Sequence, residues 1–322
     1  MKGLREVLAE IKPDIVHSHN LHPHLFQSMK WKSKLGYRLV AQLHFPTATG
    51  IDHLSARLLF KLVMWNLVKS QHEVDAFIAH TYMEKEWLVS EGIEGGLIHV
   101  VRFPGVPDEL LVYRPRSDIH EKLSANTVIT YISRIHPRKG QHLLVEATTH
   151  LKHYLRDLKV YIAGPPSDLK YLRELYALVD KLNLGKIVVI DPRPLSEEEK
   201  LDVIGSSDVF ACTTLRDIHP IVILEALALK TPVVTTDVGA IPEMLNPVII
   251  SEEHSETVQS AVAQQIKEIV SITKADPKSI SDAIVKLVGI KDPKYGGIFN
   301  IMIKPYLTSK IVDKLIQIYN NL

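Results

Sequence analysis

The sequence predicts an α/β protein of two Rossmann-like doubly wound domains, each built on a parallel sheet. The length of 322 residues corresponds to about two domains. Short runs rich in Val and Ile alternate with segments of helical period. The runs lack the polar alternation of strands that face water on one side, which is typical of strands covered on both faces. Helices between such strands return the chain to begin a parallel neighbour.

Strands and helices alternate in order along the chain. In the first part the strands are expected at 14–17, 38–44, 75–80 and 98–103, and the helices at 2–11, 23–34, 53–70 and 82–91. After a polar stretch the pattern begins again, with strands at 127–133, 159–164, 186–191, 209–214 and 232–237, and helices near 256–273 and 277–288. We therefore expect a first domain over 1–110 and a second over 111–305.

The composition excludes several classes of protein. A single cysteine, Cys212, cannot form an intrachain disulfide and suits a reducing cytoplasm, where we expect the protein to reside. Lys plus Arg number 38 against 37 for Asp plus Glu, so no global field favours nucleic acid. The most apolar segment, 54–68, is interrupted by two cations and an asparagine, and the N-terminus has no signal-peptide run. The sequence thus predicts neither a membrane span nor secretion.

Polar and glycine-containing turns follow the expected strands. In doubly wound folds ligands bind beyond the carboxyl ends of the strands, where the strand order reverses. The turns there are 17–19, 44–46, 134–140, 164–166, 191–193, 214–220 and 238–240. This edge is where a phosphate or sugar site is expected.

Two acids are separated by seven residues in the most informative segment of the chain. Glu225 falls on a helix expected to begin near His219 or Pro220, since proline is tolerated in a first turn. Amides at such a helix start can face an anion or a hexose oxygen, and Glu225 can accept two vicinal hydroxyls. From the residues alone, Asp217 as an N-cap and Glu225 as an ordinary helical acid remain open.

This segment resembles the donor-site signature of the retaining glycosyltransferases of family 4, which have the GT-B fold of two Rossmann-like domains. The signature is an acid, seven residues, Glu-Ala, a Pro-Val-Val strand and a Gly-x-x-x-Glu turn. It corresponds to Asp217, Glu225-Ala226, 231–234 and 239–243. Asp217 stands where the family mostly has Glu, and His219 where an aromatic residue is usual.

A second segment, 132–147, resembles the family's diphosphate-binding segment. Arg134 and Lys139 occupy the places of the two cations that hold the nucleotide diphosphate, and Ser133 replaces a usual glycine. Fixed cations stabilise the charge that a diphosphate gains as it leaves. The resemblance also puts Gly164 near the nucleotide and the loop 191–193 near its base. Taken alone, the two cations could equally be solvated loop charges.

The first domain contributes segments that resemble the acceptor-side domain of the family, at 13–20, 40–44, 75–81 and 102–107. His44 occupies the place of the histidine that faces the donor sugar, although a core or loop histidine is the alternative. The tail, 309–322, is amphipathic and resembles the terminal helix that crosses back onto the first domain. The resemblance therefore implies that 306–322 joins the first domain.

Family members usually open with a strand, a glycine-rich turn and two further strand and helix units before the segment matched by 13–17. We therefore expect an incomplete first domain in this chain. A fragment or misplaced start codon, a split enzyme whose N-terminal part is another polypeptide, and a degenerate inactive paralogue are the three explanations. The partner expected for the chain is accordingly an N-terminal partner chain or a second copy in a homo-oligomer. Because the donor motifs are present, the first two are favoured.

The resemblance implies retaining transfer of a hexose from a nucleoside diphosphate sugar to a hydroxyl acceptor, which could be a glycan, a lipid or a small molecule. We expect no cofactor, no metal and no nucleic-acid partner. The expected catalytic residues are His44 and Asp217. The expected donor-binding residues are Arg134, Lys139, Gly164, His219, Pro220, Ile221 and Glu225.

Three alternatives stay open. A non-catalytic sugar-nucleotide-binding subunit would bind donor without turnover. A metal-dependent hydrolase could use the four histidines within 17–24, since His-x-His at a strand end is a metal pair in barrel hydrolases. The helix at 53–70, which carries three cations beside Phe60 and Trp65, either packs only on its sheet or also contacts an anionic membrane surface.

Overall fold

The computed structural model describes residues 3–44, 54–103, 105–246, 256–290 and 296–322. It divides into two compact units, Met1–Pro104 with Ser309–Leu322, and Gly105–Thr308. The expected turn residues Phe45 and Pro46 lie outside the described residues, as do parts of the region 246–305. None of the described helices is long and apolar enough to span a membrane.

The first unit is built on a parallel sheet whose four described strands run in chain order, β1-β2-β3-β4. This order does not reverse within the described part of the unit. The elements are α1 (Leu4–Ile11), β1 (Ile15–His19), α2 (Pro23–Leu35), β2 (Arg38–Gln42), α3 (Leu54–Lys69), η2 (Gln71–Glu73), β3 (Ala76–Ala79), α4 (Tyr82–Ser90), η3 (Gly95–Leu97), β4 (Ile98–Val100) and α15 (Thr308–Asn320).

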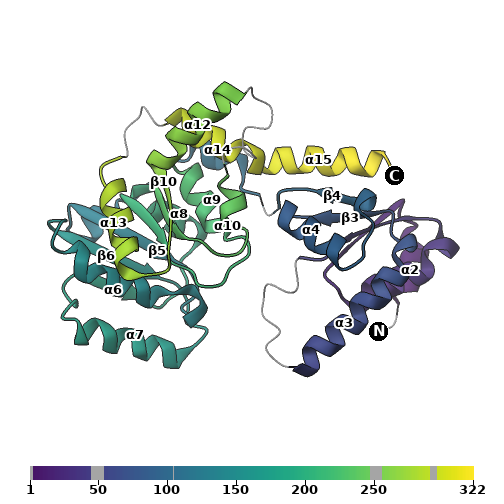
Figure 1. Ribbon diagram of the computed structural model, residues 1–322, viewed down its shortest axis with the longest axis horizontal. Helices are drawn as coiled ribbons and strands as arrows, with labels where there is room; N and C mark the ends of the chain where they lie inside the picture. Colours follow the sequence, from purple (N-terminus) through teal and green to yellow (C-terminus); the bar gives the residue numbers. More distant parts are fainter. Residues whose placement is uncertain (1–2, 45–53, 104, 247–255, 291–295) are drawn as a thin grey trace. The chain divides into compact units, whose positions relative to one another are not determined.

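The two faces of the first sheet are covered from different parts of the chain. Leu39 and Phe77 pack with the apolar sides of α1 to α4 in one core. Val40, the residue after Leu39 in β2, packs instead with Ile311 and Ile318 of α15. Because successive strand residues point to opposite faces, the sheet has two cores, and the C-terminal helix supplies one of them (Figure 1).

The second unit has a six-stranded parallel sheet of order β10-β9-β8-β5-β6-β7. The order reverses at β5, which lies between β8 and β6, so the predicted doubly wound arrangement is confirmed here. The elements are η4 (Asp108–Val112), α5 (Ile119–Leu123), β5 (Thr127–Ile132), η5 (Pro137–Lys139), α6 (Gln141–Leu151), β6 (Leu158–Ala163), α7 (Leu169–Lys181), β7 (Val188–Asp191), α8 (Glu197–Ser206), β8 (Val209–Cys212), α9 (Ile221–Ala228), β9 (Val233–Thr236), α10 (Ile241–Met244), α12 (Glu256–Ile269), β10 (Val270–Thr273), α13 (Pro277–Leu287), α14 (Gly296–Ile303) and η7 (Lys304–Tyr306).

One helix prediction is wrong at its end. The helix expected at 256–273 ends at Ile269, and the next four residues form β10, which pairs with β9 from Val270↔Val233 to Thr273↔Thr236. Residues 270–273 are Val-Ser-Ile-Thr, three of them β-branched, and β9 offers an edge on which they can pair. Tertiary pairing therefore decides against one more helical turn.

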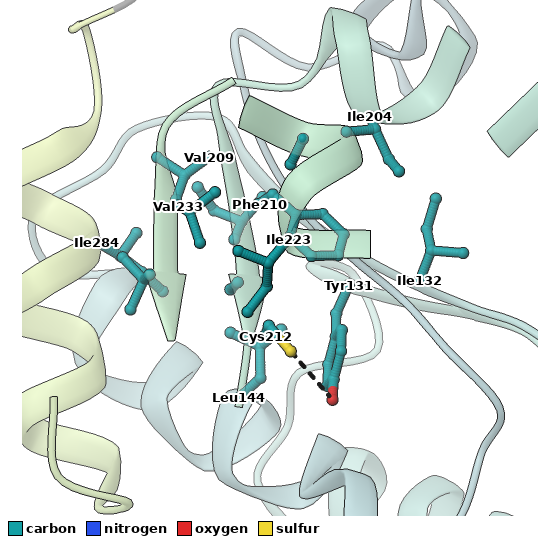
Figure 2. Close-up of a cluster of buried hydrophobic side chains, with 14 of the residues drawn as sticks. Tyr131, Ile132, Leu144, Ile204, Val209, Phe210, Cys212, Ile223, Val233 and Ile284 are labelled. Atoms are coloured by element: carbon teal, nitrogen blue, oxygen red, sulfur yellow. Dashed lines mark hydrogen bonds between the residues drawn. The ribbon is translucent and has the colours of Figure 1, made fainter. Parts of the chain in front are cut away.

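Helices cover both faces of this second sheet. α6 and α13 lie side by side on one face, and α8 and α9 contact each other on the other (Figure 1). Figure 2 shows the core between them, where the Tyr131 ring meets Phe210 edge to face at 6.2 Å and its hydroxyl lies 3.9 Å from the Cys212 sulfur. Burial raises the pKa of Cys212 to about 11, so this thiol stays protonated and packs as a small apolar group.

Candidate functional site

Three glycines bring loops into contact at the carboxyl edge of the second sheet. A Cβ on Gly164 would lie 2.1 Å from the carbonyl oxygen of Ser133, and one on Gly140 would lie 2.1 Å from that of Thr213. A Cβ on Gly239 would lie 1.9 Å from the carbonyl oxygen of Asp217. All three have positive φ, at +137°, +64° and +58°. Only glycine fits at these positions, because a side chain would strain the backbone and displace the facing loop.

Lys139 and Asp217 meet where the strand order reverses. Their side chains form an ion pair, 25% and 19% exposed, between the turn after β5 and the turn after β8. The two turns are joined by the Leu215 amide, which donates to the Arg138 carbonyl at 2.8 Å. The Tyr131 hydroxyl of β5 donates to the Lys139 carbonyl at 2.7 Å and holds the first of these turns against its own strand. The N-cap of α9 is Pro220, so the alternative of Asp217 as the cap of this helix is wrong.

Arg134 lies in the same turn as Lys139, and its side chain is exposed. Its carbonyl accepts a hydrogen bond from Gln141 Nε2 at 2.9 Å, and Ser133 Oγ lies 3.0 Å from the same nitrogen. Gln141 is fully buried, and its Oε1 has no hydrogen-bond partner in the described structure. Sequence reasoning missed Gln141; a polar residue directly after the Gly140 turn, at the start of α6, is the signal that could have found it.

Glu225 is buried inside α9, with 6% of the residue exposed. Its Oε1 accepts a hydrogen bond from Lys200 Nζ at 2.8 Å, whereas its Oε2 has no partner among the described residues. Burial raises the pKa of Glu225, and the neighbouring Lys200 ammonium opposes that rise. Lys200 also pairs with Glu197 at 2.8 Å. No sequence signal links Lys200 to Glu225, because the two belong to different helices.

His219 stands at the position where the family signature usually has an aromatic residue. Its ring meets Tyr306 edge-on at a centroid distance of 6.1 Å, and neither ring nitrogen has a partner in the part of the chain described. Burial lowers the pKa of His219 to about 4, so the ring is neutral at physiological pH. It therefore packs as an aromatic ring. Pro220 and Ile221 follow as the N-cap and first residue of α9, slightly later than expected.

The loop after β7, which is expected near the nucleotide base, is held in place by ion pairs. Arg193 forms ion pairs with Asp191 at 3.1 Å and with Glu199 of α8. The hydrogen bond from Arg193 lowers the pKa of Glu199 to about 2. The Tyr161 hydroxyl donates to Asp191 at 2.6 Å, and the Gly164 amide donates to the Asp191 carbonyl at 3.0 Å. The loop is thus held against both α8 and the Gly164 turn.

His44 follows β2 in the first unit and has a φ of +57°. Its Nε2 lies 2.9 Å from His19 Nδ1, and its ring meets His80 edge-on at 4.8 Å. Burial lowers the pKa of His44, and the nearby His19 adds to this effect. The His17 ring stacks on His19 at 4.5 Å and bonds the Tyr319 hydroxyl of α15 at 2.6 Å. His44 therefore belongs to a group of imidazoles at the carboxyl end of the first sheet.

The histidines at 17–24 do not assemble a metal centre within the described structure. No three His, Cys, Asp or Glu side chains described there are grouped so that they could hold a metal ion. His17 and His19 join the imidazole group of the first sheet, whereas His22 and His24 stack on each other at 5.9 Å. The geometry gives the hydrolase alternative no support.

The two parallel α/β units and the loops at the strand-order reversal define a protein of the GT-B glycosyltransferase fold. The structure of Anabaena HepE in complex with UDP matches with a TM-score of 0.75 and 17% identity, covering 98% of this chain and 80% of that one. The model of glycosyl transferases group 1 matches residues 115–286, and that of glycosyltransferase family 4 matches residues 1–107. The chain belongs to the glycosyl transferases group 1, so the predicted resemblance is confirmed.

Two named relatives are similar to this chain, one over about half of its length and the other over most of it. D-inositol 3-phosphate glycosyltransferase of Mycobacterium sp. (strain KMS) is 32% identical over 176 residues, which are 53% of this chain and 39% of the relative. The phosphatidylinositol N-acetylglucosaminyltransferase GPI3 subunit of Saccharomyces cerevisiae (strain YJM789) is 24% identical over 88% of this chain and 62% of its own. The match thus spans about two fifths of the length of the first of these relatives.

Proposed function

We propose that this chain transfers a hexose from a nucleoside diphosphate sugar to a hydroxyl acceptor, with retention of anomeric configuration. The bond between the anomeric carbon and the diphosphate oxygen breaks, and a bond to the acceptor oxygen forms on the same face of the sugar. The proton of the acceptor hydroxyl passes to the departing nucleoside diphosphate, which takes the electron pair of the broken bond. The acceptor is a glycan, a lipid or a small molecule.

One arrangement carries this proposal. Two cations, Arg134 and Lys139, lie in the turn at the strand-order reversal. Helix α9 follows the neighbouring turn at the same edge of the sheet and carries the buried carboxylate of Glu225, whose Oε2 has no partner among the described residues. Cations suit a diphosphate whose charge grows as it leaves, and a carboxylate oxygen suits a ribose hydroxyl. The relative solved with UDP and the relatives named as glycosyltransferases support the same function.

The remaining site residues have proposed roles in catalysis or in donor binding. Asp217, held beside Lys139, and His44 of the first unit are the proposed catalytic residues. The turn at Gly164 and the start of α9 at His219, Pro220 and Ile221 complete the proposed donor site, since helix-start amides favour anionic or hydroxyl oxygens.

Calorimetric titration with UDP, GDP and ADP tests the donor site. Changing Arg134 or Lys139 to Ala should weaken binding of the preferred nucleotide by about 1.5–3 kcal/mol, as expected for a lost charge-assisted hydrogen bond. Lys181→Ala, an exposed lysine at the end of α7, is the matched control and should bind as the wild type does. Unchanged affinity in both site variants would contradict the assignment.

Two further arms complete the experiment. Because side-chain cations and helix-start amides are proposed to face the diphosphate, EDTA should leave donor binding unchanged, and binding that requires added Mg²⁺ or Mn²⁺ would refute this. Transfer of labelled sugar to a mixed acceptor extract separates the enzyme from the non-catalytic subunit, which would bind nucleotide without turnover.

A further inference from the structure

Two neighbouring residues on α8 hold two different parts of the candidate donor site. Ser196 caps the helix, and its Oγ accepts from the Glu199 amide at 3.1 Å, which fixes the first turn. Glu199 then pairs with Arg193 in the loop after β7. The next residue, Lys200, pairs with Glu225 of α9 at 2.8 Å. The start of α8 therefore holds both the loop after β7, which is expected near the nucleotide base, and the buried carboxylate of Glu225.

The environment of Lys200 distinguishes this ion pair from a surface one. The Lys200 side chain is 20% exposed and that of Glu225 is 8% exposed, whereas its other partner, Glu197, is 72% exposed. An isolated buried carboxylate would take up a proton, because burial disfavours its charged form. Lys200 supplies the compensating positive charge at one oxygen only. The second oxygen of Glu225 keeps its full capacity to accept hydrogen bonds.

We propose that Lys200 is a positioning residue of the donor site, which holds Glu225 ionised and oriented so that Oε2 accepts a ribose hydroxyl of the donor. This inference rests on the proposed function, in which Glu225 binds the ribose. A lysine that served stability alone would hold the two helices together without affecting which hydroxyl-bearing ligand binds. Loss of Lys200 should instead affect recognition of the ribose hydroxyls specifically.

The test compares two ligands that differ only in those hydroxyls. The probe is the tightest binder of UDP, GDP and ADP, and its partner is the 2′,3′-dideoxy form of the same nucleotide. In the wild type we expect the hydroxyl-bearing form to bind about tenfold tighter or more, because a buried acceptor left unpaired is costly. Lys200→Met should reduce this ratio towards one at pH 7. Lys200→Arg should preserve most of it, since the cation is retained.

The pH dependence gives a readout that a purely structural role would not move. The charged groups near the Glu225 carboxyl are Lys200 and Glu197, the first favouring ionisation and the second opposing it. Only the ionised carboxylate accepts at both oxygens, so affinity falls as the pH falls through the pKa of Glu225. Without Lys200 that pKa rises further, and Lys200→Met should therefore lose affinity at a higher pH than the wild type does.

Further variants separate the outcomes. Lys200→Met combined with Glu225→Gln removes both charges, so it should fold without an unpaired buried carboxylate and discriminate no better than Glu225→Gln alone. Lys181→Met is the control outside the site. A wild-type ratio near one overturns the ribose role of Glu225 and this inference with it. A clear wild-type ratio that Lys200→Met retains, with an unshifted pH profile, overturns this inference while the proposed function stands.

Discussion

Burial shifts the pKa of two residues of the candidate site, His219 and Glu225. His219 loses its basicity because burial outweighs the opposing effect of the Asp217 carboxylate, and it packs on Tyr306 as a neutral ring. Glu225 is also enclosed, and the Lys200 ammonium pairs directly with it at 2.8 Å. A directly paired charge of opposite sign thus favours the ionised form of a buried group, whereas burial without such a pair favours the neutral form.

His219→Phe should make folding less sensitive to acid. The folded pKa of His219 is about 4 against an ordinary 6.5, so the unfolded chain binds more protons between these values. Stability is therefore present above pH 6.5 and is lost as the pH falls towards 4. From pH 7 to pH 5 this residue accounts for a loss of about 2 kcal/mol, which the phenylalanine variant should not show. Urea unfolding at the two pH values measures the difference. The control is exposed His153→Phe, and equal acid sensitivity of His219→Phe and the wild type would contradict the expectation.

At the scale of elements, α3 has an inner and an outer face of similar apolar character. Met64 and Leu67 are buried in the first unit, whereas Leu62 and Trp65 are 64% and 58% exposed. Lys69 Nζ lies 3.7 Å above the Trp65 ring. Arg57, Lys61 and Lys69 are the charged residues of α3. The helix therefore packs on its sheet and also presents apolar and cationic groups outward.

From this outer face we predict contact with an anionic membrane surface. Tryptophan and leucine enter the headgroup boundary while lysine and arginine pair with lipid phosphates. The chain should co-sediment with vesicles containing about 30% phosphatidylserine several-fold more than with neutral vesicles. Leu62→Asp with Trp65→Asp should abolish this binding. Leu169→Asp, on an exposed residue of α7 in the second unit, is the control. Equal sedimentation of the double variant and the wild type would exclude α3 as the contact.

At the scale of the whole molecule, the first unit is assembled from both ends of the chain. One face of its sheet is covered by helices that follow their strands, and the other by α15, which begins more than 200 residues after β4 ends. Val40 and Ile78 of the sheet pack with Ile311 and Ile318. One of the two cores of the first unit is therefore completed by residues that are far from its strands in the sequence.

Ile318→Asp should destabilise the first unit by about 3 kcal/mol, because it buries an unpaired charge against the sheet. Ile318 is 7% exposed, whereas Ile316 of the same helix is 48% exposed. Ile316→Asp is thus a matched control that should cost little. Limited proteolysis followed by mass spectrometry locates the effect, with faster cleavage expected within 3–103. Equal protection of the two variants would show that α15 contributes little to the unit.

Much of the fold and the site could be predicted from local pattern. The strands from β1 to β9 fall where runs of Val and Ile were found, because a strand buried on both faces needs an apolar side chain at nearly every position. The turns that contain Gly164 and Gly239 could also be located from the sequence. The structure adds the reason for glycine there, since no other residue takes this backbone conformation so close to a facing carbonyl. The family resemblance rested on these same local features.

The sequence by itself therefore determined the α/β class, the succession of strands and the turns that carry the candidate donor residues. The tertiary structure alone decided that 270–273 pair as β10, that Asp217 pairs with Lys139 instead of capping α9, and that Lys200 pairs with Glu225. The physical reason is that periodicity and turn chemistry act between neighbours in the chain. Ion pairing, burial and sheet edges depend on residues that meet only after the strand order has brought separate turns together.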